Sequence, residues 1–143
     1  MTIQRVTREE GLNRLLELAD ILDVADAEHA VNDEPSYSQD IFFHECGTPA
    51  CAGGHWAVAH PERWIVRDFR PYLREAPPSH LSAISERGTA LRVYESLRIE
   101  FALTYDEGQE IFGGNGCGNA HTGKQAAAYI REFVEDERKA MNA

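Results

Sequence analysis

One stretch of the sequence decides the fold: His44-Glu45-Cys46-Gly47-Thr48-Pro49-Ala50-Cys51-Ala52-Gly53-Gly54-His55-Trp56-Ala57. It contains two of the three cysteines and two of the six histidines of the chain. Thr48 suits a helix N-cap and Pro49 suits the first helical position, because proline lacks the N–H that would be unpaired there. His60-Pro61 marks a boundary. The stretch therefore predicts a helix over about 49–60. The other elements of the chain are expected to pack around this helix and hold it in place.

The cysteines and histidines of this stretch are of the types that bind zinc. On a helix, Cys51 and His55 share a face because they are four residues apart. Together with His44 and Cys46 they supply two sulfurs and two imidazoles, the ligand set of a structural zinc site. Their spacing is tighter than in common zinc modules, which join two short ligand pairs by about a dozen residues or more. The candidate metal ligands are thus His44, Cys46, Cys51 and His55, with zinc as the candidate metal.

Three other interpretations of the same residues stay open. Cys46 and Cys51 are close enough in sequence to form a disulfide, although cytosolic proteins rarely contain one. Cys51 in the first turn of the helix would have a lowered thiol pKa and could act as a nucleophile with His55 as its base, but no third group that would orient the histidine is visible. The simplest interpretation is that both cysteines are small buried residues at a tightly packed helix start, with no catalytic role.

Apolar periodicity predicts a mainly α protein with about five helices in a single compact domain over 1–143. Thr7-Arg8-Glu9-Glu10 has capping-box spacing and begins a helix over about 8–24. Further helices are predicted over 88–103, from the Thr104 capping box to Gly113, and after Thr122. The predicted buried positions of the first helix are Leu12, Leu15, Leu16, Ala19 and Leu22. Those of the last helix are Ala126, Ile130, Phe133, Val134 and Met141.

The β content is predicted to be at most a short strand pair at Ile41–Phe43 and Trp64–Phe69, although 64–69 also fits one side of a helix. Arginines recur nearby at Arg63, Arg67, Arg70 and Arg74. We interpret them as a solvated face and place no site there, because charged side chains usually stay exposed.

The glycine-rich segment 113–123 repeats the Cys-x3-His spacing at Cys117 and His121. A glycine-rich loop before a helix can bind an anion. A nucleotide-binding P-loop is excluded, because no hydroxyl residue follows Lys124 and no apolar strand precedes the loop. We interpret the segment as a connection rich in turn residues.

The run Cys46-Gly47-Thr48-Pro49-Ala50-Cys51-Ala52-Gly53-Gly54-His55 resembles an uncharacterised group of small bacterial and phage proteins. The group has a Cys-Gly-Thr-x-x-Cys-x-x-Gly segment followed by histidine or tryptophan. Its second, weaker segment is similar to Leu103–Phe112 here. The resemblance implies a compact, largely helical protein organised around the cysteine segment, and it implies no activity. An alanine is expected where Gly53 stands, and Cys117 and His121 are not part of the shared pattern.

Composition predicts an acidic, cytoplasmic protein. The net charge is −10, and residues 1–45 carry eleven acids against three bases. Such a balance disfavours non-specific nucleic-acid binding, which depends on lysine and arginine. No apolar run approaches the roughly 18 residues of a membrane helix, and the first ten residues do not form a secretory signal. We expect a non-enzymatic accessory protein without a cofactor, whose acidic first third contacts a basic partner protein. The alternatives are a structural zinc protein and a thiol- or metal-dependent enzyme using Cys51 and His55.

Overall fold

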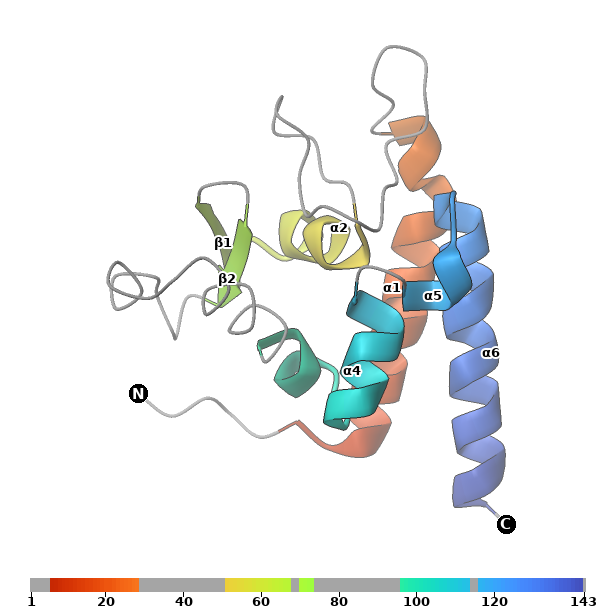
Figure 1. Ribbon diagram of the computed structural model, residues 1–143. Coiled ribbons are helices and arrows are strands. Elements are labelled where there is room, and N and C mark those ends of the chain that lie inside the picture. The colour runs from red at the N-terminus through yellow and green to blue at the C-terminus, as the bar shows by residue number, and fades with distance from the viewer. Residues whose placement is uncertain (1–5, 29–50, 68–69, 74–95, 114–115, 143) are drawn as a thin grey trace.

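The computed structural model describes residues 6–28, 51–67, 70–73, 96–113 and 116–142 (Figure 1). The predicted mainly α fold is confirmed. Its elements are α1 (Arg8–Glu28), α2 (Ala52–Ala59), β1 (Trp64–Arg67), β2 (Arg70–Leu73), a helical turn over 96–100, α4 (Tyr105–Phe112), α5 (Gly116–Asn119) and α6 (Gly123–Met141). The predicted ligands His44 and Cys46, the predicted strand Ile41–Phe43, Arg74, and the part of the predicted helix 88–103 before residue 96 lie outside the described residues.

The two long helices α1 and α6 pack side by side and run in opposite directions (Figure 1). Leucines on one side of α1 and small or branched residues on one side of α6 form much of the core, and each fully buried leucine contributes about 1.5–3 kcal/mol. The buried residues of the pair are Leu12, Leu15, Leu18, Ala19, Leu22, Ala126, Ala127, Ile130 and Val134. Leu18 was not predicted to be buried, whereas Leu16 is only partly buried.

The predicted burial of Met141 is wrong, because half of this residue is exposed (50%). Its position in the helix pair explains the error. Arg138, one turn earlier in α6, already contacts Glu9 in the first turn of α1. Met141 therefore extends past the start of α1, where none of the described helices covers it.

The predicted helix starts at Thr104 and Thr122 are confirmed. Thr104 and Glu107 form a complete capping box, in which the threonine hydroxyl accepts from the Glu107 N–H and the Glu107 carboxylate accepts from the Thr104 N–H. The Thr122 hydroxyl accepts a hydrogen bond from the Gln125 N–H. Each cap satisfies backbone donors that the first turn of a helix leaves unpaired.

The helical turn over 96–100 ends earlier than the predicted helix, because the chain reverses at Ala102. This residue has a left-handed φ of 53°. The Leu103 N–H donates to the Arg98 carbonyl and the Ala102 N–H to the Ile99 carbonyl, which is the hydrogen-bond pattern of a Schellman motif. Glycine usually occupies the left-handed position, so an alanine there gave no signal of a helix end.

Strands β1 and β2 form an antiparallel pair in which Trp64 is opposite Leu73 and Arg67 is opposite Arg70. The strand interpretation of 64–69 is thus correct for Trp64–Arg67 and the helix interpretation is wrong. The partner strand is the next segment of the chain. Two of the four arginines, Arg67 and Arg70, belong to this pair, so they do not share a helix face.

Candidate functional site

Helix α2 carries the described part of the predicted cysteine site. It begins at Ala52, later than predicted, because Cys51 is its N-cap and has an extended backbone (φ −86°, ψ 174°). Cys51 and His55 are both buried, each with 2% of its surface exposed. No cluster of three or more His, Cys, Asp or Glu side chains suited to a metal ion occurs within the described ranges. Since His44 and Cys46 lie outside those ranges, the zinc site stays a prediction.

The structure argues against a reactive Cys51. Its side chain is buried at the start of α2. Since Cys46 lies outside the described residues, the disulfide between the two cysteines stays a prediction. Burial raises the pKa of the Cys51 thiol to about 11, and the N–H groups of Gly54 and Gly53 offset only part of this effect. The prediction of a lowered pKa was wrong, because it considered the helix start and not the loss of solvent around the sulfur. A thiol of this kind is poorly suited to nucleophilic chemistry.

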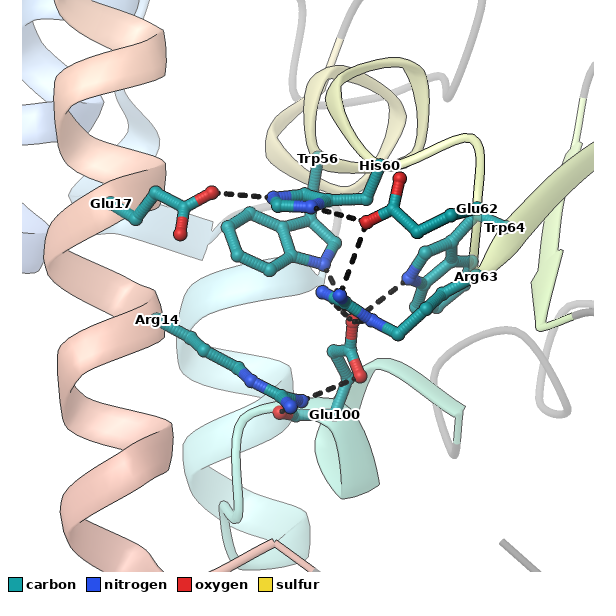
Figure 2. A network of polar contacts seen from close by, with 8 residues as sticks. All are labelled: Arg14, Glu17, Trp56, His60, Glu62, Arg63, Trp64 and Glu100. Carbon is teal, nitrogen blue, oxygen red and sulfur yellow. Dashed lines mark hydrogen bonds and ion pairs between the residues drawn. The ribbon is translucent and has the colours of Figure 1, made fainter. Parts of the chain in front are cut away.

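The most connected polar group near α2 is the buried carboxylate of Glu100, of which 5% is exposed (Figure 2). Its Oε2 accepts hydrogen bonds from the indole N–H groups of Trp56 and Trp64, both at 2.9 Å. The same oxygen accepts from Arg63 Nε at 3.1 Å and Arg63 Nη2 at 3.0 Å. Its Oε1 accepts from Arg14 Nη1 at 2.7 Å. We call these five residues the Glu100 cluster.

The Glu100 cluster joins α1, α2, the turn before β1, β1 itself and the segment 96–100. Both carboxylate oxygens are occupied by donors of this chain, so the cluster has a structural role and offers no acceptor to a ligand. The sequence analysis missed it. Trp56 belongs to the focal stretch and Arg63 was noticed, but nothing local distinguishes Glu100 from a surface acid.

His60, the C-cap residue of α2, lies directly above the cluster (Figure 2). Its ring stacks on Trp56 with the ring centroids 3.9 Å apart. Its Nε2 lies 2.6 Å from Glu17 Oε2 and its Nδ1 lies 3.2 Å from Glu62 Oε1. The Nε2 contact is not aligned as a hydrogen bond, so its attraction comes mainly from charge at short distance. The ring connects α1 with the turn that follows α2.

A groove of about 400 Å³ lies along α4 and α6 on another part of the surface. We call it the α4–α6 groove. Two aromatic side chains and five carboxylates line it. They are Glu107, Glu110, Tyr129, Glu132, Phe133, Asp136 and Glu137.

One end of the α4–α6 groove already holds a guanidinium group. Arg8 Nη1 donates to Glu107 Oε1 at 2.8 Å, and Arg8 Nη2 donates to Glu107 Oε2 at 2.7 Å. Arg8 Nη2 also donates to Glu137 Oε2 at 2.8 Å, and Nη1 donates to the Ala102 carbonyl at 2.9 Å. This guanidinium is the main cause that lowers the pKa of the Glu107 carboxyl.

The other acids of the α4–α6 groove have no cationic partner within the described ranges. Glu132 and Asp136 are exposed on α6 and form no ion pair there. Glu110 accepts a hydrogen bond from Tyr129 and also lacks an ion pair with a described residue. Burial and this hydrogen bond raise the pKa of the Tyr129 phenol to about 12, so the tyrosine is neutral. The groove therefore has a surplus of negative charge beside Tyr129 and Phe133.

In the acidic first third, which was predicted as the recognition surface, several of the described acids already have partners. Arg131 of α6 contacts both Asp20 and Asp23, and Arg138 contacts Glu9 at 2.9 Å. Much of the negative charge of the described first third is thus already paired inside the molecule. Among the described residues, exposed acids without an ion pair include Glu10 of α1 as well as Glu110 of α4 and Glu132 and Asp136 of α6.

Comparisons with known proteins add no relative: no protein-family model, no curated protein and no solved structure matches this chain. None of the helices that the structure describes is long and apolar enough to cross a membrane.

Proposed function

We propose that this protein is a non-enzymatic accessory protein that binds an arginine-containing segment of a partner protein in the α4–α6 groove. One observation carries the proposal: Glu107 and Glu137 of the groove bind the Arg8 guanidinium, and its remaining acids form no ion pair with any residue that the structure describes. Glu110, Glu132 and Asp136 continue the same acidic lining beyond Glu107 and Glu137.

The chemistry of the groove favours arginine over a compact cation. A guanidinium donates two parallel hydrogen bonds to one carboxylate, as Arg8 does with Glu107. It also stacks on aromatic faces, which Tyr129 and Phe133 supply at the groove. The net charge of −10 would attract a basic segment from a distance and speed its association.

We further propose a cytoplasmic location and a relationship to the small bacterial and phage proteins that share the cysteine segment. The cysteine count supports the location, because three cysteines are an odd number and argue against the disulfide framework that is usual outside the cytosol. The helical fold around α2 is what the relationship implies.

The test is a titration with fluorescent peptides, followed by anisotropy. One peptide carries four arginines separated by serine and glycine, and a second carries lysine at the same positions. Each is titrated with the wild type, with the groove variant Glu132→Gln/Asp136→Asn, and with the control Glu10→Gln/Asp20→Asn. The control removes the same charge from α1.

We expect the arginine peptide to bind more tightly than the lysine peptide, and less tightly as NaCl is raised from 50 to 300 mM. The groove variant should weaken binding about fivefold to tenfold, since each exposed pair contributes roughly 0.2–1 kcal/mol. The control variant should change it less than about twofold. Equal losses in both variants would show attraction by net charge alone, and an arginine peptide that does not bind at 50 mM NaCl would overturn the proposal.

A further inference from the structure

The contacts of His60 depend on the protonation of its ring. Both ring nitrogens face carboxylate oxygens, at 2.6 Å from Glu17 and 3.2 Å from Glu62. A neutral imidazole carries one N–H and one lone pair, so it can donate to only one carboxylate, and the lone pair repels the other. A protonated imidazole carries an N–H at each nitrogen, so it can donate to Glu62 through Nδ1 while its positive charge attracts Glu17, whose contact with Nε2 is not aligned as a hydrogen bond. The arrangement is therefore complete only when the ring is charged.

We propose that His60 is a proton-dependent latch that holds α2 and the turn before β1 against α1. The latch does not depend on the α4–α6 groove. Glu17 belongs to α1, while Glu62 follows α2 in the chain, so protonation of one ring strengthens a contact between two separate elements. The face of the ring covers Trp56, which keeps it close to both carboxylates.

The groups nearest the ring carry charges of both signs. The two nearest, Glu17 and Glu62, are negative. Arg63 is positive, but its guanidinium contacts two carboxylates. Its Nη1 is 3.2 Å from Glu62 Oε1 and its Nη2 is 3.0 Å from Glu100 Oε2. The pKa of the Glu62 carboxyl is lowered, first by a backbone N–H and then by His60. The charged groups around the latch are Glu17 and Arg14 of α1, Glu62 and Arg63 of the turn, and Glu100 beneath Trp56.

The direction of the effect follows from linkage. Because the charged ring attracts both carboxylates and the neutral ring attracts only one, the latch stabilises the fold at lower pH and loses its contribution as pH rises. Histidine side chains change charge between about pH 5 and 8, so the effect belongs to that range. Glu17 and Glu62 are about half exposed (51% and 59%), so solvent screening makes the effect modest.

The experiment measures urea unfolding midpoints by tryptophan fluorescence at pH 6.0 and pH 8.0. The variants are His60→Gln and Glu17→Gln, with His121→Gln as the matched control, because His121 is exposed and far from the latch in sequence. The wild type should have a midpoint about 0.3 M higher at pH 6.0 than at pH 8.0. His121→Gln should keep this difference, and both latch variants should lose most of it.

The double variant His60→Gln/Glu17→Gln completes a cycle. The two single substitutions should be coupled at pH 6.0, with the coupling falling by at least about half at pH 8.0. A pH difference that survives unchanged in Glu17→Gln, a surface variant that should fold normally, would overturn the latch. So would a wild-type midpoint that is the same at both pH values.

Discussion

At the scale of single residues, the main feature is the buried carboxylate of Glu100, which accepts hydrogen bonds from four side chains. Two indoles and two guanidiniums donate five hydrogen bonds to its carboxylate. A buried ion pair adds little stability over a well-packed apolar alternative, because the charges lose their water. Removing one partner is costly all the same, because the charges that remain lose their compensation. Glu100 thus fixes which segments pack together more than it adds to total stability.

Replacement of Glu100 with glutamine should destabilise the fold by about 3 kcal/mol. The amide lacks the negative charge that Arg14 and Arg63 contact, and its NH2 group would face N–H donors. Urea unfolding monitored by tryptophan fluorescence measures the loss, and Trp56 and Trp64 report on the site itself. Glu132→Gln is the control, because Glu132 is exposed, and it should change stability by less than about 0.5 kcal/mol. A Glu100→Gln variant as stable as this control would mean that the cluster is dispensable.

At the scale of elements, α1 is positioned by a close approach to the chain reversal after 96–100. The backbone of α1 at Gly11 lies against the Phe101 carbonyl, and a Cβ at Gly11 would be 2.0 Å from that oxygen. The ring of Phe101 itself lies between the rings of Trp56 and Phe112. Its centroid is 4.7 Å from that of Trp56 and 5.1 Å from that of Phe112. The glycine thus allows α1 to reach the aromatic centre of the core.

Two glycine-to-alanine substitutions should have opposite effects. Gly11→Ala should destabilise the fold by about 2–3 kcal/mol, because its methyl group meets backbone atoms that cannot move independently. In Gly108→Ala the nearest atoms to the new methyl group would be Arg98 Cβ, Cγ and Cδ, at 3.5 to 4.0 Å, which are ordinary contacts. Since Gly108 is inside α4, alanine should stabilise the helix by about 0.5–1 kcal/mol. Thermal unfolding by circular dichroism measures both, and equal effects would contradict the assigned packing of α1.

At the scale of the whole molecule, stability should depend on pH in opposite ways at the two extremes. The Glu107 and Asp23 carboxyls have lowered pKa values, caused mainly by Arg8 and Arg131. Their contributions are present above the ordinary pKa values of 4.5 and 3.8 and are lost as pH falls. Cys51 and Tyr129 have pKa values raised to about 11 and about 12, so the unfolded chain releases these protons first as pH rises. Stability should then fall above about pH 9.

The Cys51→Ala variant tests the alkaline side. Between pH 9 and 11 the wild-type unfolding free energy should fall with a slope of up to about 1.4 kcal/mol per pH unit from this thiol. The variant lacks the thiol, so its slope should be smaller over the same range, whereas the slope below pH 5 should be unchanged. Urea midpoints at half-unit pH steps measure this. Identical alkaline slopes in both proteins would contradict a buried, neutral Cys51.

The sequence by itself determined the helical class and most helix boundaries that depend on local chemistry. The caps at Thr104 and Thr122 were predictable because a threonine hydroxyl binds N–H groups within the next three residues. The buried side of α1 was largely predictable for a similar reason, since helical periodicity sets which residues share a face. Local rules failed at Ala102, where an alanine takes a position that glycine usually occupies, and at Cys51, where burial outweighs the effect of the helix start.

Only the tertiary structure decided which charges are paired. The acids of α1 contact arginines of α6 more than 100 positions away in sequence, as Asp20 does with Arg131. Glu100 is separated from Trp56 by 44 positions, and Arg8 from Glu107 by 99. Counting charges along the chain therefore does not reveal which acids are available, because a carboxylate is available to a partner only if no cation of the same molecule already binds it. That is determined by how the helices pack, and local sequence does not encode it.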